Sequence, residues 1–269
     1  MKIAFVTFGN FDGHATLKRA TGMASPLMTL GHKVHLLMEE SPINREKVTT
    51  ECPEAKVHWH IRDRSPLAER RAKQQTLKKI QPDVVWICGV GLRNWVFRHS
   101  RSALLLGDHS ELFSQVNSGR VRRLVYGVTE WIYCFAFDGQ ICASRYLETF
   151  YQRRLKRLGK DPGRIHYLPY AFHPGVIHLD PIGAAEVQAR YPGKKIILYM
   201  GSFGENYGFW DMLKAFKRIG EQRNDFVAIF AGRGPEKEKG ERWVKEMELS
   251  DSIIIEGYVP EESLSAYFG

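Results

Sequence analysis

Two short apolar runs, each followed by a glycine loop, constrain the fold of this 269-residue chain most strongly. The first run, Ile196 to Met200, leads into Gly201-Ser202-Phe203-Gly204, and the second, Phe226 to Ala231, leads into Gly232-Arg233-Gly234-Pro235. The segment between the runs predicts a helix, because its apolar residues recur every three or four positions: Trp210, Leu213, Phe216 and Ile219. Parallel βα units bind ligands at the carboxyl ends of their strands, where glycines let backbone N–H groups approach phosphate. The pattern therefore predicts a site for a nucleotide or another phosphorylated molecule.

The length and composition favour a two-domain globular protein. The 269 residues exceed the usual size of one hydrophobic core, and 43% hydrophobic with 26% charged residues is an ordinary globular composition. The opening apolar run, Ile3 to Phe8, is too short for a signal peptide, and Leu124 to Phe137 is too short to span a bilayer. We therefore expect a cytoplasmic or peripheral protein. The four cysteines lack metal-ligand spacing, which favours buried reduced thiols and predicts no metal site.

The first part of the chain predicts a series of strands and crossover helices, with a polar cluster after one strand. A strand at Lys2 to Phe8 precedes a glycine loop that contains Gly13 and His14. The loop lacks the dinucleotide-binding fingerprint, and it is interpreted either as a ligand loop or as a plain turn. A later strand, Ser102 to Leu106, leads into Gly107-Asp108-His109-Ser110-Glu111. Because α/β proteins place their chemistry at such strand ends, His109 is a candidate site residue, although a lone histidine is more often structural.

The positive charge of the chain is concentrated in its first part. Residues 1–175 have 27 Lys and Arg against 15 Asp and Glu, whereas residues 176–269 have 12 against 15. No nucleic-acid-binding module is present, so we expect no nucleic-acid partner. An anionic membrane or a phosphorylated acceptor fits the charge, and so do solvated faces of basic helices such as Glu69 to Lys79. Gly119 to Phe137 combines three arginines with aromatic residues, which suits a membrane interface, although most of its apolar surface is more simply interpreted as core.

The order of these motifs resembles that of the retaining GT-B glycosyltransferases of family four. The resemblance rests on strand, glycine loop, helix, strand and Gly-x-Gly-Pro, followed by Glu256-Gly257-Tyr258-Val259-Pro260, and on a Gly-His-Lys-Val turn near residue 31. It implies an α/β fold of the GT-B type with two Rossmann-like domains that have parallel sheets. We expect an acceptor-side domain at 1–172 and a nucleotide-sugar-binding domain at 173–269, which the resemblance implies is incomplete.

The resemblance also implies a function and a set of site residues. The implied reaction moves a hexosyl unit from a nucleotide sugar, with retention and without a metal or other cofactor, to an acceptor such as a lipid-linked or cell-envelope glycan. Gly201, Ser202, Arg233 and Gly234 would surround the donor phosphates. Gly13, His14 and His109 would face the donor, the transferred sugar and the acceptor, with His109 as the catalytic residue.

Two departures from the family pattern keep other functions open. Ser202 and Tyr207 stand where the family places an arginine and a lysine on the donor diphosphate, and Arg233 is a candidate replacement. The family also continues past the position of Gly269 into a Glu-x7-Glu segment, so we interpret the chain as a fragment of a transferase and expect it to be inactive alone. The alternatives are a non-catalytic nucleotide-sugar-binding protein and a GT-B epimerase or phosphorylase.

Overall fold

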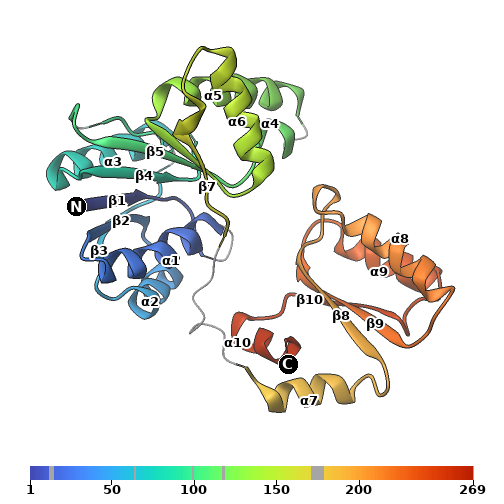
Figure 1. Cartoon of the computed structure of the whole chain (residues 1–269). Helices are drawn as coiled ribbons and strands as arrows, with labels where there is room; N and C mark the ends of the chain where they lie inside the picture. Colours follow the sequence, from blue (N-terminus) through green and yellow to red (C-terminus); the bar gives the residue numbers. More distant parts are fainter. Residues whose placement is uncertain are drawn as a thin grey trace. The chain divides into compact units, whose positions relative to one another are not determined.

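The chain divides into two compact units, Met1–Phe172 and His173–Gly269. The computed structural model describes residues 1–11, 15–63, 65–91, 93–98, 100–116, 119–170 and 179–268. Gly13 and His14 lie outside the described residues. Each unit is an α/β structure with a parallel sheet (Figure 1), as the sequence predicts.

Unit 1, residues Met1–Phe172, contains a seven-stranded sheet with the order β3-β2-β1-β4-β5-β6-β7, in which every pairing is parallel. The strands are β1 (Lys2–Val6), β2 (Lys33–Glu39), β3 (Lys56–His60), β4 (Val84–Cys88), β5 (Leu104–His109), β6 (Gly139–Cys142) and β7 (Ile165–Tyr167). The helices are α1 (Ala15–Thr29), α2 (Pro42–Glu51), α3 (Pro66–Ile80), α4 (Phe113–Val116), α5 (Arg120–Ala136) and α6 (Arg145–Arg157), with a 3₁₀ turn at Pro162–Arg164.

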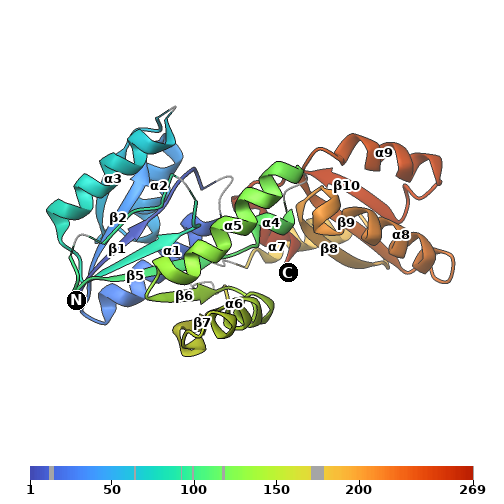
Figure 2. The same cartoon turned by 90° about the horizontal axis from the view of Figure 1, so that it is seen from above.

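The helices of unit 1 cover both faces of its sheet (Figure 1). On one face α1 and α2 pack on β1 and β2 through Leu17, Ala24 and Val48. On the other face α3 and α5 pack on β1, β4 and β5 through Leu77, Tyr133 and Phe137. Seen from above, α5 lies across the part of the sheet that contains β5 and β6 (Figure 2). Strands buried on both faces are continuously apolar, which explains runs such as Val84–Cys88.

Unit 2, residues His173–Gly269, contains a three-stranded parallel sheet with the order β10-β9-β8. The strands are β8 (Lys195–Ser202), β9 (Phe226–Arg233) and β10 (Ile253–Gly257). The helices are α7 (Pro181–Ala189), α8 (Phe209–Gly220), α9 (Lys237–Glu246) and α10 (Glu261–Leu264), with 3₁₀ turns at Glu205–Tyr207 and Ser265–Tyr267. α8 and α9 cover one face, and α7 with the last 3₁₀ turn covers the other (Figure 1).

Several glycine segments that we interpreted as loops are the last residues of strands. β5 continues through Gly107–His109 because these residues pair with β6, and β8 and β9 continue to Ser202 and Arg233 because they pair with each other. The glycine at position 107 is required by packing: a Cβ there would lie 2.7 Å from the ring of Phe137. The four cysteines are buried and free, as predicted.

Candidate functional site

The topology of unit 1 places a switch point between β1 and β4. From β1 the chain adds β2 and β3 on one side, whereas β4 and the later strands extend the sheet on the other side. In open α/β sheets ligands bind outside the carboxyl ends of the strands at such a point. The residues that follow β1 and β4 at this edge are Thr7–Phe11 and Gly89–Gly91.

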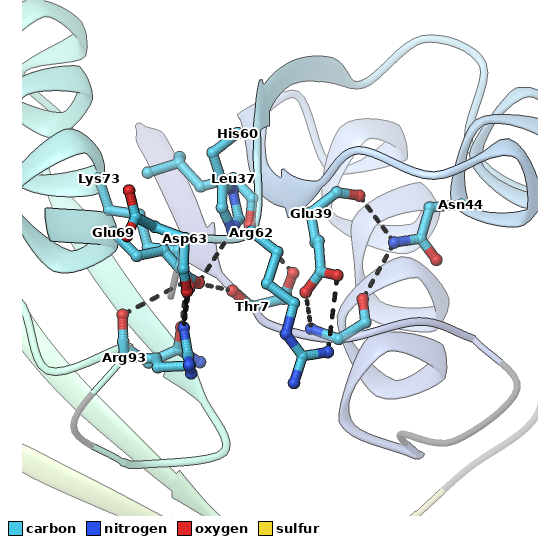
Figure 3. A network of polar contacts seen from close by, with 12 residues as sticks. Thr7, Leu37, Glu39, Asn44, His60, Arg62, Asp63, Glu69, Lys73 and Arg93 are labelled. Atoms are coloured by element: carbon cyan, nitrogen blue, oxygen red, sulfur yellow. Dashed lines mark hydrogen bonds and ion pairs between the residues drawn. The ribbon is translucent and has the colours of Figure 1, made fainter. Parts of the chain in front are cut away.

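Lys73 joins the two sides of this switch point from helix α3 (Figure 3). Its side chain is 1% exposed, and its Nζ donates to the carbonyl of Thr7 at 2.9 Å, to Oδ1 of Asn94 at 2.6 Å and to Oε1 of Glu69 at 2.9 Å. Thr7 follows β1 and Asn94 follows β4. The buried ammonium therefore fixes the two strand-end segments relative to each other. Burial lowers the pKa of Lys73, and Glu69 opposes this effect.

Glu69 is the buried counter-charge of this cluster. Its Oε2 accepts from Nη1 of Arg93 at 2.7 Å, and its Oε1 lies 3.2 Å from Nε2 of His60 at the end of β3. Burial alone would raise the pKa of Glu69, but Lys73 and Arg93 outweigh burial and lower it, so the carboxyl is ionised. Burial, with the nearby charge of Lys73, lowers the pKa of His60 to about 4, which makes this imidazole neutral at pH 7.

Glu39 and Asn44 hold the backbone of the glycine loop after β1 (Figure 3). The N–H of Gly9 donates to Oε2 of Glu39 at 3.1 Å, and the amide of Asn44 donates to the carbonyl of Gly9 at 3.0 Å. The N–H of Phe11 donates to Oδ1 of Asn44 at 3.1 Å. Because Glu39 and Asn44 are buried, the loop is fixed up to Phe11. Arg62, with a side chain that is 61% exposed, lies 3.8 Å from Glu39 at the outer edge of this network.

A second buried ion pair lies at the end of β5. Oδ2 of Asp108 accepts from Nε of Arg19 at 2.7 Å and from Nε1 of Trp86 at 3.0 Å. Arg19 is on α1, and its two other nitrogens donate to the carbonyls of Leu168 and Pro169, at 2.7 and 3.1 Å. Burial raises the pKa of Asp108, and the guanidinium of Arg19 opposes this effect. This pair joins the helix after the glycine loop to the segment that leaves β7.

His109, our catalytic candidate, lies inside an aromatic cluster. It is 4% exposed, and its ring centroid lies 4.5 Å from that of Tyr151 and 5.6 Å from that of Tyr133. Its Nδ1 is 3.3 Å from the hydroxyl of Tyr151. Burial lowers the pKa of His109 to about 3, so the ring is neutral at pH 7. The polar neighbour Asp108 lies on the α1 side of the sheet with Arg19, whereas His109 lies on the side of α5 and α6.

The candidate phosphate residues of unit 2 lie side by side. Gly201 pairs with Gly232 and Ser202 with Arg233 in the ladder between β8 and β9, and the N–H of Phe203 donates to the carbonyl of Arg233 at 2.9 Å. The guanidinium of Arg233 lies 4.7 Å from the centroid of the Tyr258 ring. The expected site residues Gly201, Ser202 and Arg233 are all exposed at this edge.

Close packing between these two loops explains why they contain glycine at positions 232 and 234. A Cβ at Gly232 would overlap the carbonyl oxygen of Gly201, and a Cβ at Gly234 would lie 2.7 Å from the nitrogen of Phe203. Gly208, with φ 71°, allows the turn into α8, whose first residue is Phe209. Helix α8 therefore begins next to the carboxyl ends of β8 and β9, where its free N–H groups and positive dipole end favour an anion.

One surface concavity of unit 1 lies away from its polar network. It is at the amino ends of β4 and β5 and is lined by Gln81, Pro82, Asp83, Ser100, Ser102 and Ala103. Among the described residues no group of three or more His, Cys, Asp or Glu side chains is placed to hold a metal ion. In the same part of the chain no helix is both long enough and apolar enough to cross a membrane.

The sequence did not reveal most of the unit 1 network. One of our alternatives was that Glu69 to Lys79 forms a solvated basic face; Arg71, Lys78 and Lys79 are exposed, but Glu69 is 2% and Lys73 is 1% exposed. The available signal was helical spacing, because Leu77 and Ile80 define the buried face of α3, and Lys73 and Glu69 precede Leu77 on that face by four and eight positions.

Comparison with known structures identifies the class of fold. HepE from Anabaena, solved with UDP and glucose, matches with a TM-score of 0.69 at 12% identity, over 98% of this chain and 71% of HepE. Sucrose-phosphate synthase from Thermosynechococcus elongatus matches with a TM-score of 0.71 at 18% identity, over 100% of this chain and 73% of that protein. These likenesses show that the chain has the GT-B fold, as its sequence predicts.

A sequence comparison gives a family match within unit 2. Residues 184–269 match the family described as Glycosyl transferases group 1. A comparison with curated proteins found no match. A protein from Listeria monocytogenes described as a UDP-N-acetylglucosamine 2-epimerase has the same fold, with a TM-score of 0.56 at 12% identity, over 99% of this chain and 71% of that protein.

Proposed function

We propose that this chain takes part in the transfer of a hexosyl unit from a nucleotide sugar to an acceptor, with retention. The observation that carries the proposal is the match of residues 184–269 to the Glycosyl transferases group 1 family, because it covers both strand-end loops and the start of α8. The solved complexes of HepE contain UDP, and this supports a uridine diphosphate sugar as the donor.

In the proposed mechanism unit 2 binds the donor diphosphate. The N–H groups at the start of α8 and the guanidinium of Arg233 stabilise the negative charge that develops on the departing diphosphate, which is the main electrostatic contribution to such a transfer. Ser202 supplies a hydroxyl at the same edge, Gly201 exposes its backbone there, and Gly234 lets the second loop pack closely on the backbone of Phe203. Arg233 thus takes over the charge that Ser202 and Tyr207 lack relative to the family pattern.

Unit 1 is the proposed acceptor side, for a glycan or lipid-linked acceptor. Its buried charges fix the strand ends around the glycine loop, where Gly13, His14 and His109 remain the predicted residues for the sugar. The proposal includes a cytoplasmic location at the membrane surface, since residues 1–175 have the excess of Lys and Arg. Metal independence remains a prediction from the resemblance.

Binding of UDP to the 269-residue chain, measured by isothermal titration calorimetry, tests the donor site. We expect Arg233→Ala to weaken UDP binding at least about tenfold, because a charge-assisted hydrogen bond contributes about 1.5–3 kcal/mol. Arg218→Ala, at an exposed position in the last turn of α8, is the matched control and should leave the affinity unchanged. Equal affinities of the Arg233 and Arg218 variants would remove Arg233 from the site.

The epimerase alternative is favoured by the Listeria structure and predicts a different product. Incubation of the chain with UDP-N-acetylglucosamine, followed by proton NMR, distinguishes the two. An epimer of the intact nucleotide sugar would support the alternative. In an active form of the protein, release of UDP that depends on an added acceptor would support the transferase, and UDP binding without either change would favour a binding protein.

A further inference from the structure

Helix α5 of unit 1 has an apolar face that points outward. Val121 is 76%, Leu124 71% and Val128 53% exposed, and three more apolar residues of the same helix are exposed: Val125, Ile132 and Phe135. All six recur at intervals of one, three or four residues, which places them within an arc of roughly 100° on a helix. The stripe of these six residues is therefore continuous along the 17 residues of α5. It contradicts our interpretation that most of this apolar surface is core.

The opposite face of α5 is the one that packs on unit 1. Glu130, Tyr133 and Cys134 are its buried residues. Oε1 and Oε2 of Glu130 accept from the backbone N–H and the hydroxyl of Ser114, at 3.0 and 2.8 Å, and Nη2 of Arg154 lies 3.6 Å away. Glu130 is thus hydrogen-bonded inside the protein, and the stripe lies on the opposite side of the helix from the face that packs in the core. An exposed apolar stripe of this extent on a protein surface marks an interaction site.

Basic residues are frequent on α5 and on α6, which packs against it. Arg120, Arg122 and Arg123 are exposed in the first turn of α5, and exposed Arg153, Lys156 and Arg157 lie on α6. Between residues 119 and 160 the chain has nine Lys and Arg but three Asp and Glu. Each of the three carboxylates is paired with an arginine: Glu130 with Arg154, Asp138 with Arg98, and Glu148 with Arg145. This segment of unit 1 is therefore strongly cationic, and Nζ of Lys160 lies 4.7 Å from the ring centroid of Phe135 in the stripe.

The exposed apolar stripe together with the positive charge of this segment indicates which kind of partner α5 binds. We propose that α5 docks unit 1 on an anionic lipid bilayer, with the stripe in the headgroup region and the arginines on the lipid phosphates. An interfacial helix gains binding energy from its buried apolar face and from anionic lipid together. A second copy of the chain is disfavoured as the occupant, because pairing two stripes would bring two sets of arginines together. This docking specifies how the protein reaches the proposed location at the membrane, and it rests on the proposed function because a lipid-linked acceptor would give it a use.

Sedimentation of the full chain with lipid vesicles tests the docking. We expect binding to vesicles of phosphatidylcholine with phosphatidylglycerol, little binding to phosphatidylcholine alone, and a decrease with salt. Arg122→Glu/Arg123→Glu should reduce the partition coefficient at least about tenfold, since each basic residue near an anionic surface contributes several-fold in affinity. Lys78→Glu/Lys79→Glu on α3 changes the net charge equally and should have a much smaller effect. Equal losses in the two variants would overturn docking through α5.

A fluorescent probe separates insertion of the stripe from adsorption by charge. Because the four natural cysteines are buried, Leu124→Cys can be labelled selectively with an environment-sensitive dye. Its emission should shift to the blue on anionic vesicles, whereas the same label at Ile182→Cys, 76% exposed on α7, should not shift. No shift at position 124 would overturn the inference. Light scattering that shows a dimer converted to a monomer by Leu124→Ser would assign the stripe to a second copy and overturn it as well.

These outcomes are separable from the proposed function. Affinity for UDP depends on unit 2 and should not change in the α5 variants. Loss of vesicle binding with unchanged UDP affinity supports docking through α5. Absence of vesicle binding in the unaltered chain, with UDP still bound, refutes the docking and leaves the donor site standing.

Discussion

Replacement of the buried lysine of α3 tests whether the polar network fixes the switch point of unit 1. Lys73→Met keeps the length and the apolar stem of the side chain but removes the ammonium. The carbonyl of Thr7 and Oδ1 of Asn94 then lose a donor, and Glu69 loses its buried counter-charge. Removal of one partner from a buried ion pair costs about 3–5 kcal/mol. Since Arg93 and His60 still contact Glu69, we expect the lower value, about 3 kcal/mol.

Calorimetry and hydrogen exchange measure this loss separately for the two units. For a unit of this size each kcal/mol shifts the Tm by about 2–4 °C, so the transition of unit 1 should fall by about 6–12 °C while that of unit 2 stays in place. Lys78→Met, on the exposed side of the same helix, is the matched control and should change stability by about 0.5 kcal/mol or less. Amide exchange of residues 7–11 should accelerate in the Lys73 variant alone, because Lys73 binds the start of that loop.

Two results would refute this reasoning. A Tm for Lys73→Met equal to that of Lys78→Met would mean that the buried charges contribute no net stability. Unchanged exchange in residues 7–11 would mean that Lys73 does not hold the loop. The double variant Glu69→Gln/Lys73→Met adds a third check, because removing both charges should recover part of the loss.

Two further predictions concern the buried histidines and the glycine loops. Burial lowers the pKa of His60 to about 4 and the pKa of His109 to about 3. As the pH falls from about 6.5, the unfolded chain therefore binds protons before the folded chain does, and unit 1 should lose stability. At pH 4 the loss from His60 should be about 3 kcal/mol in the free energy of unfolding, measured by urea titration. His109→Phe, which retains a ring between Tyr133 and Tyr151, should reduce this slope, and an unchanged slope would contradict the burial of a neutral ring. In an active form of the protein, turnover of this variant tests the predicted catalytic role. Gly234→Ala should destabilise unit 2 by about 1–3 kcal/mol, because the new Cβ would meet the backbone of Phe203. The control Gly220→Ala has open space around it and should be neutral or stabilising. Equal melting temperatures of the two variants would contradict the close approach of Gly234 to Phe203.

The arrangement of strands and helices was accessible from the sequence because it depends on local patterns. Apolar runs such as Val84–Cys88, separated by amphipathic helices, leave few options other than parallel sheets covered on both faces. The ends of the strands were less accessible. Gly107 and Gly201 lie in glycine-containing segments that are typical of loops, but both residues are paired in the sheets. At Gly107 the ring of Phe137 occupies the space that a side chain would need. A packing partner about 30 residues away leaves no local signal.

Helical spacing alone was not enough to predict that Glu69 and Lys73 are buried. Glu69 and Lys73 are spaced as a surface ion pair would be, four residues apart on a helix. What buries them is the acceptor set supplied by Thr7 and Asn94, from the ends of two different strands. Only the topology brings these ends together, so the pair is read as solvent-exposed until the sheet order is known.

Helix α5 shows the converse case, in which the amphipathic pattern is visible but its direction is not. The sequence indicates one apolar and one polar face, and the usual expectation is that the apolar face packs inward. In unit 1 the inward face instead contains Glu130 and Tyr133, whose polar groups are bonded to Ser114 and to the carbonyl of Val90. Tyr133 and Cys134 also belong to the hydrophobic clusters of unit 1, so α5 is apolar on two sides. One apolar face is buried in the core and the other is exposed, and the sequence pattern alone does not tell which of the two packs inward.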